Sequence, residues 1–205
     1  MSGRRLAVFG AGGMGREAAW LVHAAGDTLV CFVDDRAVEG LDAPVIPLEA
    51  LPAEVEGVVV AIGAPTTRVR VAERVLAAGL ALASVAHPTA QVGPRVTLGP
   101  GALLMPHAVL TADITLGRLA QINVGASLSH DGRAGEALTL SPGAHVPANV
   151  HFGERCFVGT GASFVNGLPD RPLRVGDDSV VGAGACVVRD VPPGVTVVGV
   201  PAQSR

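Results

Sequence analysis

The sequence predicts two structures in succession: a small α/β domain over residues 1–86 and a parallel β-helix over residues 87–205. In the first part, short apolar runs alternate with helical stretches, which favours a parallel sheet covered by helices. From residue 92 onward, large apolar residues recur at every sixth position, which is the repeat of a parallel β-helix. The junction is expected near His87, where the alternation ends and the repeat begins.

The first part is interpreted as a half-domain of the Rossmann kind. Strands that alternate with helices imply right-handed βαβ units. The expected elements are strands over 6–9, 29–33, 58–62 and 80–86 and helices over 16–25 and 67–78. This is barely half of a full dinucleotide domain, so a nucleotide diphosphate that carries a sugar fits better than a hydride-carrying NAD.

A glycine-rich turn joins the first strand to the first helix. Glycines at 10, 12 and 15 match the dinucleotide fingerprint. They let the backbone approach a phosphate, and the helix start offers free N–H groups. Asp34 ends the second strand about 20 residues further on, where an acid can bond a ribose hydroxyl. The turn therefore predicts a nucleotide site, and a tight turn without a ligand is the alternative.

The second part repeats a hexad of one large and one small inward residue. In a strand such as Ala126-Ser127-Leu128, the outer two side chains point to one side and the middle one to the other. Three hexads make a triangular coil of 18 residues, and coils stack at about 4.8 Å. The large positions are Val92, Leu98, Leu104, Leu110, Leu116, Ile122, Leu128, Leu140, Val146, Phe152, Val158, Phe164, Val175, Val181 and Val187. The spacing slips once, after Phe164, and both Cys156 and Cys186 are expected to be inward core residues.

Composition excludes several classes of function. The net charge is −3, aromatic residues are 3% of the chain and tyrosine is absent, which argues against a nucleic-acid surface. The apolar run after Arg5 ends at Phe9, which is too short for a signal-peptide core or a membrane span. We expect a cytoplasmic protein.

Several motifs together resemble one family. They are Gly10 to Gly15, Phe32-Val33-Asp34-Asp35, Ala61-Ile62-Gly63, His87-Pro88-Thr89-Ala90, the hexads and Gly199-Val200-Pro201-Ala202. The chain is similar over essentially its whole length to bacterial sugar acetyltransferases, which include sialic acid O-acetyltransferases and nucleotide-activated 4-amino-sugar N-acetyltransferases. The resemblance implies a left-handed β-helix that forms a homotrimer, with acetyl-CoA in the groove between neighbouring subunits. It also implies that the α/β domain holds a nucleotide-sugar and that no metal is needed.

The resemblance also assigns the site residues. The segment from 122 to 131 matches the one that bears the family's catalytic histidine, so His130 is the expected general base and Asp131 its carboxylate partner. The expected contacts of the nucleotide-sugar are Gly12, Gly13, Met14, Asp34, Asp35 and Asn123. The expected contacts of acetyl-CoA are Thr139, Ala148, Thr160 and Ala183.

Spacing supports His130 independently of the resemblance. It follows the inward Leu128 by two residues, which places it at an outward corner. Ala148 lies 18 residues later, at the same corner of the next coil, and the resemblance implies that the thioester carbonyl binds near its N–H. Met14 and Thr139 stand where some relatives carry histidine, and the segment 167–174 is longer than in those relatives.

The expected reaction is direct transfer from acetyl-CoA to an amino or hydroxyl group of a sugar. Three alternatives stay open: a non-catalytic nucleotide-sugar-binding protein, a hexapeptide-repeat carbonic anhydrase, and a dehydrogenase. The carbonic anhydrase would need three histidines that converge on a metal, and this sequence lacks the close histidine pair found in those enzymes. The identity of the sugar and the nucleotide, and the choice of N- or O-acetylation, are likewise open.

Overall fold

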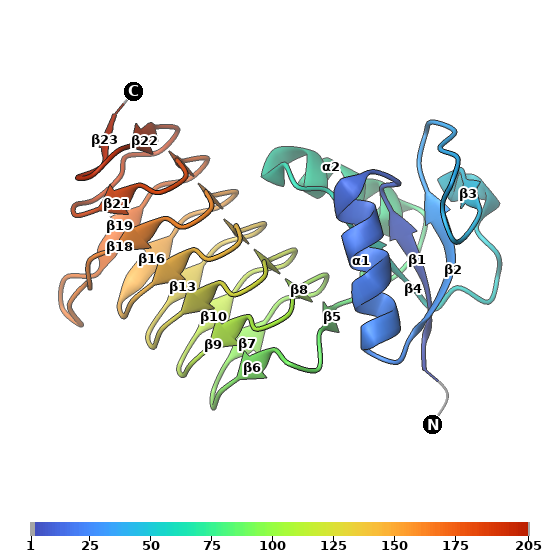
Figure 1. The fold of residues 1–205 in the computed structure, drawn as a ribbon, viewed down its shortest axis with the longest axis horizontal. Helices are drawn as coiled ribbons and strands as arrows, with labels where there is room; N and C mark the ends of the chain where they lie inside the picture. The colour runs from blue at the N-terminus through green and yellow to red at the C-terminus, as the bar shows by residue number, and fades with distance from the viewer. Residues whose placement is uncertain (1–2, 205) are drawn as a thin grey trace.

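A computed structural model describes residues 3–204 and shows an α/β domain beside a long prism of stacked coils (Figure 1). The coils run away from the α/β domain, so the C-terminal coils lie farthest from it. Of the helices described, none is long and apolar enough to cross a membrane.

The α/β domain is a four-stranded parallel sheet with strand order β3-β2-β1-β4. Its elements are β1 (Arg5–Phe9), α1 (Gly13–Ala24), β2 (Thr28–Val33), β3 (Val45–Ile46), a 3-10 turn (Leu48–Ala50), β4 (Gly57–Val60) and α2 (Pro65–Ala77). The inner residues of β1 and β4 are almost fully buried, as expected for strands covered on both faces.

Two elements differ from the sequence prediction. Helix α1 begins at Gly13, three residues early, because Gly12 already takes the extended N-cap conformation. The strand predicted over 80–86 does not form as one piece. Leu82 makes only an isolated bridge to Val58, and β5 (Val85–Ala86) pairs with the first coil of the prism.

The prism has three faces, each a sheet of short, mostly parallel strands. The first face contains β5, β8 (Leu103–Leu104), β11 (Gln121–Ile122), β14 (Thr139–Leu140), β17 (Phe157–Val158), β20 (Val180–Val181), β22 (Thr196–Val198) and the antiparallel β23 (Gln203–Ser204). The second face contains β6 (Gln91–Val92), β9 (Val109–Leu110), β12 (Ser127–Leu128), β15 (His145–Val146), β18 (Ser163–Phe164) and β21 (Cys186–Val187). The third face contains β7 (Thr97–Leu98), β10 (Thr115–Leu116), β13 (Arg133–Ala134), β16 (Val150–Phe152) and β19 (Leu173–Val175).

The hexad prediction is confirmed in register and in burial. Ser127 pairs with Val109 one coil before and with His145 one coil after, a step of 18 residues. Leu128 and its stacked neighbours Leu110 and Val146 are 0% to 1% exposed. Val92 is 48% exposed despite its inward position, because β6 ends its sheet and has no coil beneath it.

One of the two cysteines predicted to face inward lies elsewhere. Cys156 is inward and 1% exposed, as predicted, and burial raises the pKa of its thiol to about 12. Cys186, in contrast, lies between the buried Ala185 and Val187 and is only half-buried. Alternation along a strand therefore turns its side chain outward.

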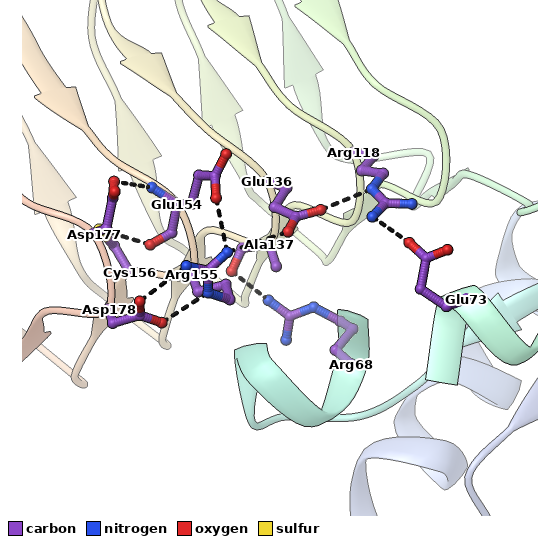
Figure 2. A network of polar contacts seen from close by, with 10 residues as sticks. All are labelled: Arg68, Glu73, Arg118, Glu136, Ala137, Glu154, Arg155, Cys156, Asp177 and Asp178. Atoms are coloured by element: carbon purple, nitrogen blue, oxygen red, sulfur yellow. Dashed lines mark hydrogen bonds and ion pairs between the residues drawn. The ribbon is translucent and has the colours of Figure 1, made fainter. Parts of the chain in front are cut away.

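The α/β domain is joined to the prism through a fully buried arginine of α2 (Figure 2). The guanidinium of Arg68 donates to the carbonyls of Ile62 and Gly63 on its own side and to Leu119 and Ala137 in the prism. It also donates to the side chains of Gln121 and Thr139 at 2.9 and 2.8 Å. Burial lowers the pKa of Arg68 to about 9, which still leaves it charged at neutral pH.

Ion pairs extend this junction along the neighbouring edge of the prism (Figure 2). Glu73 of α2 pairs with Arg118, and Arg118 pairs with Glu136 of the next coil. Arg155, one coil further, joins Glu136 to Asp178. The edge between the third and first faces is thus tied coil by coil to the α/β domain.

Candidate active site

His130 stands on the edge between the second and third faces, which we call the His130 edge (residues 129–132, 147–149 and 165–172). The inward Leu128 is fully buried, and two residues later the His130 side chain is 58% exposed. Its Nδ1 lies 2.7 Å from Oδ2 of Asp131. This contact makes Nδ1 the protonated nitrogen, so Nε2 carries the lone pair of a general base.

Backbone bonds between coils hold this corner. Asp131 takes a left-handed conformation with φ 59°, which asparagine and aspartate tolerate better than most residues. Its N–H donates to Ala112 of the coil before, and the N–H of Asn149 donates to the His130 carbonyl at 3.1 Å. Ala148 is therefore stacked beside His130, and its N–H has no backbone acceptor among residues 3–204.

The glycine turn is open on one side and closed on the other. A side chain on Gly12 would meet nothing within 4 Å, and one on Gly13 would meet only the end of Arg16. At Gly15 a Cβ would lie 1.9 Å from the carbonyl oxygen of Gly10, so the helix packs directly on the turn. A ligand can approach the backbone at Gly12 and Gly13, with Met14 half-buried beside them.

Both acids after β2 already have partners in the chain. Oδ2 of Asp34 accepts the N–H of Ala11 at 3.0 Å, which ties the second strand to the glycine turn. Both carboxylate oxygens of Asp35 accept from Arg74 of α2 at 2.8 Å. These hydrogen bonds hold the pKa of Asp35 below its usual range. Asp34 is thus placed beside the turn, whereas Asp35 is directed toward α2.

The expected acetyl-CoA contacts do not all lie together. Only Ala148 shares the His130 edge. Thr160 and Ala183 are exposed on the edge between the first and second faces, which we call the Thr160 edge (123–126, 141–144, 159–162 and 182–185). Asn123 is also on that edge, 9% exposed, and its side chain donates to the Leu140 carbonyl.

Thr139 is not in a groove. It lies in the domain junction, 2% exposed, and its hydroxyl accepts from Arg68. Since the outward side of β14 is covered here by α2, the Thr139 side chain is engaged within its own chain. Hexad spacing predicts that a side chain points outward but not what covers it, so the burial of Thr139 under α2 could not be predicted from the spacing.

Two hollows flank a hairpin on the His130 edge. The hairpin is the long segment 167–173, in which Leu168 and Arg171 exchange backbone hydrogen bonds at 3.0 Å. One hollow, of about 450 Å³, includes Asp131, Arg133, His151 and Pro169 in its lining. The other, of about 590 Å³, lies against the remaining part of the hairpin and Val188 to Asp190. The basic residues of the first hollow are functional candidates that the sequence analysis did not identify.

No metal centre is found in the described part of the chain. Residues 3–204 contain no group of three histidine, cysteine, aspartate or glutamate side chains that could hold an ion.

Comparison with known proteins supports the resemblance over the whole chain. Residues 5–75 match the family described as PglD N-terminal domain. GDP-perosamine N-acetyltransferase from Escherichia coli O157:H7 is 31% identical over 209 positions, covering 96% of this chain and 94% of that protein.

Two solved structures are similar throughout. The acetyltransferase domain of PglB from Neisseria gonorrhoeae FA1090, in complex with acetyl coenzyme A, gives a TM-score of 0.90 at 36% identity, covering 99% of this chain and 100% of that one. The second is a perosamine N-acetyltransferase from Caulobacter crescentus with CoA and GDP-perosamine bound and one histidine replaced by asparagine. It gives a TM-score of 0.89 at 35% identity, covering 98% of this chain and 96% of that one.

The hexapeptide β-helix and its similarity to acetyltransferases that bind acetyl-CoA or CoA place the chain in the class of acyltransferases. Similarity over the full length, in sequence and in structure, identifies the family within this class. The chain belongs to the hexapeptide-repeat sugar acetyltransferases. The predicted fold, a Rossmann-like half-domain followed by a left-handed parallel β-helix, is confirmed.

Proposed function

We propose that the protein transfers an acetyl group from acetyl-CoA to an amino or hydroxyl group of a nucleotide-linked sugar, with His130 as general base. The observation that carries the proposal is the exposed His130–Asp131 pair beside the N–H of Ala148. The relatives add the substrate class, because one is a GDP-perosamine N-acetyltransferase and others bind acetyl-CoA, CoA or GDP-perosamine.

The geometry supports direct transfer in a ternary complex. The unprotonated amine or the hydroxyl of the acceptor attacks the thioester carbonyl, and Nε2 of His130 takes the proton that the nucleophile loses. The N–H of Ala148 donates to the oxyanion of the tetrahedral intermediate. The intermediate collapses, the C–S bond breaks and CoA leaves as the thiol after taking up a proton.

A covalent route through cysteine is not favoured. Cys31 and Cys156 are buried, and burial raises the pKa of both thiols. A thiol of high pKa carries little of the reactive thiolate. Cys186 is outward on the second face, but three strands along the sheet from Ser127, which places it about 14 Å from the coil of His130.

We also propose that the active site lies between subunits of a homotrimer. Ala148 is on the His130 edge, whereas Thr160 and Ala183 are on the Thr160 edge, across the second face. One acetyl-CoA can contact both sets if the Thr160 edge of a second copy approaches the His130 edge of the first. A contact between two different edges is heterologous, and such contacts form a closed ring when the rotation between copies closes, as it does in a trimer with three-fold symmetry. Light scattering is expected to give three times the chain mass, and a monomer that retains activity would contradict this arrangement.

The function is tested by thiol release from acetyl-CoA. The assay uses UDP-, GDP-, dTDP- and CMP-linked amino and hydroxy sugars, and mass spectrometry locates the new acetyl group. We expect stoichiometric thiol and acetylated product with at least one amino-sugar nucleotide. Tight binding of a nucleotide-sugar without thiol release would favour the non-catalytic alternative.

A further inference from the structure

The order of strands in the α/β domain determines where its ligand crevice lies. Strands β2 and β3 lie on one side of β1, and β4 lies on the other. In open parallel sheets, ligands bind outside the carboxyl ends of the strands at the point where the order reverses in this way. The crevice of this domain is therefore expected between the glycine turn that follows β1 and the segment 61–64 that follows β4.

The segment 61–64, which we call the β4 loop, forms the second wall of this crevice. It contacts the glycine turn, because a Cβ on Gly10 would lie 2.8 Å from the carbonyl oxygen of Ala61. A Cβ on Gly63 would meet nothing within 4 Å, and both Gly63 and Ala64 are exposed. The β4 loop thus presents open backbone beside the glycine turn.

Arg68 holds two peptide groups of the β4 loop in one orientation. Its Nη1 donates to the carbonyls of Ile62 and Gly63 at 2.8 and 3.0 Å. In a planar trans peptide the N–H points opposite to the carbonyl, so the N–H groups of Gly63 and Ala64 point away from Arg68. Neither N–H has a backbone acceptor among residues 3–204. They are therefore donors that a ligand on the exposed side of the loop can use.

The prism holds Arg68 from the other side (Figure 2). Nη1 also donates to Oε1 of Gln121 at 2.9 Å, and Nη2 donates to the hydroxyl of Thr139 at 2.8 Å. The amide nitrogen of Gln121 lies 3.4 Å from the carbonyl oxygen of Val60, at the end of β4. Arg68 is fully buried, so the orientation of the β4 loop depends on side chains of the β-helix.

We propose that Arg68 is a positioning residue for the nucleotide-linked acceptor, because it orients the N–H groups of Gly63 and Ala64 toward the nucleotide. The proposal rests on the proposed function and goes beyond the joining of two domains, since it gives Arg68 an effect on substrate affinity. It also places Thr139 on the acceptor side, in place of the acetyl-CoA contact that the resemblance implies. A purely structural arginine would contribute to stability and leave the affinity of the folded protein for nucleotides unchanged.

The test measures nucleotide binding to the intact protein by calorimetry, well below the melting temperature. UDP, GDP, dTDP and CMP are titrated separately, and the nucleotide that binds the wild type most tightly is kept. Arg68→Lys retains the charge but lacks the planar fork that spans the loop and the prism. We expect it to weaken nucleotide binding at least about tenfold, as for a lost hydrogen bond to a charged group, and to leave CoA binding unchanged. Arg70→Lys, on the exposed side of the same helix, is the control.

Thr139→Val is a milder variant that keeps the test valid if Arg68→Lys does not fold. It removes one acceptor of Arg68 and nearly conserves the volume of the side chain. We expect nucleotide binding to weaken about threefold and CoA binding to match the wild type. Thr196→Val makes the same change on the same face, three strands away from β14, and should alter neither.

Several outcomes would overturn the proposal. They are unchanged nucleotide binding in both variants, equal weakening by Arg68→Lys and Arg70→Lys, and a wild type that binds none of the four nucleotides. A loss of CoA affinity in Thr139→Val with nucleotide binding intact would place Thr139 at the acetyl-CoA site and would also overturn it. Because no readout requires acetyl transfer, a failure here is distinct from a failure of the proposed function, which thiol release measures.

Discussion

At the scale of single residues, the proposed acetyl transfer depends on the hydrogen bond between His130 and Asp131 and on the left-handed backbone of Asp131. The 2.7 Å contact between His130 and Asp131 links adjacent residues, and Asp131 adopts a left-handed φ of 59°. This conformation turns the chain sharply after His130 and exposes both side chains. The resemblance identified this pair, and hexad spacing independently placed His130 outward.

Asp131→Asn isolates the charge of the pair, because asparagine also tolerates the left-handed conformation. The imidazolium that forms as His130 takes the proton loses its carboxylate partner. We expect kcat to fall at least about tenfold, with little change in the KM for acetyl-CoA. Steady-state kinetics checks this, and an unchanged kcat would remove Asp131 from the proton-transfer step.

Cys156 provides a residue-scale test of the prism core. Because its pKa is raised to about 12, it carries almost no thiolate at pH 8.5. Iodoacetamide should leave it unmodified in the native protein and alkylate it after unfolding in urea, as followed by peptide mass spectrometry. Equal rates of alkylation in the native and unfolded states would contradict the inward placement of Cys156.

At the scale of elements, two glycines of one corner of the prism, Gly159 and Gly161, are needed for different reasons. Gly161 has φ +66° and open space around it, so a side chain there would strain only the backbone. Gly159 is in contact with the next coil: its Cβ would lie 2.5 Å from the backbone nitrogen of Ala183. Gly161 is therefore needed for its left-handed backbone conformation, and Gly159 is needed because there is no room for a side chain.

Gly161→Ala and Gly159→Ala form a matched pair at this corner. We expect Gly161→Ala to cost about 1 to 2 kcal/mol, the strain of a left-handed alanine. Gly159→Ala should cost clearly more, because the coils must separate to admit the methyl group. Thermal unfolding measures the difference, and a Gly159→Ala protein that melts above Gly161→Ala would contradict the packing described.

Most elements could be predicted from the sequence because their signals are local. A hexad fixes which side chains face inward, and the fold follows from repeating it. The errors arise where a distant segment decides the outcome. Thr139 is engaged because Arg68 of α2 covers it, and β5 joins the prism because Val85 pairs with Leu103. Cys186 is different: the alternation around it was present in the sequence and was misassigned by one position.

At the scale of the whole molecule, one buried charge joins the two parts. All three guanidinium nitrogens of Arg68 donate to oxygens of the prism, and Nη1 also donates to the carbonyls of Ile62 and Gly63 in the α/β domain. The burial of Arg68 could not be predicted from the sequence, because an arginine on an exposed helix face and one in a domain junction have the same sequence pattern.

Arg68→Met should loosen this junction. The substitution keeps an unbranched side chain but leaves several buried oxygens unpaired, each at about 1 to 3 kcal/mol. We expect Tm to fall by roughly 5 to 10 °C, and proteolysis between α2 and β5 to become faster. Arg70→Met, on the exposed side of the same helix, is the control. An Arg68→Met protein as stable as the control would show that the junction does not depend on this residue.

The account as a whole depends on His130, and its most direct test compares acetyl transfer by the wild type and His130→Ala. The comparison uses the best acceptor from the nucleotide-sugar panel and includes His23→Ala, a change in an exposed residue of α1, as control. We predict that His130→Ala loses at least about a hundredfold in thiol release while its assembly mass and acetyl-CoA binding match the wild type. Full turnover by an intact His130→Ala assembly would contradict the account.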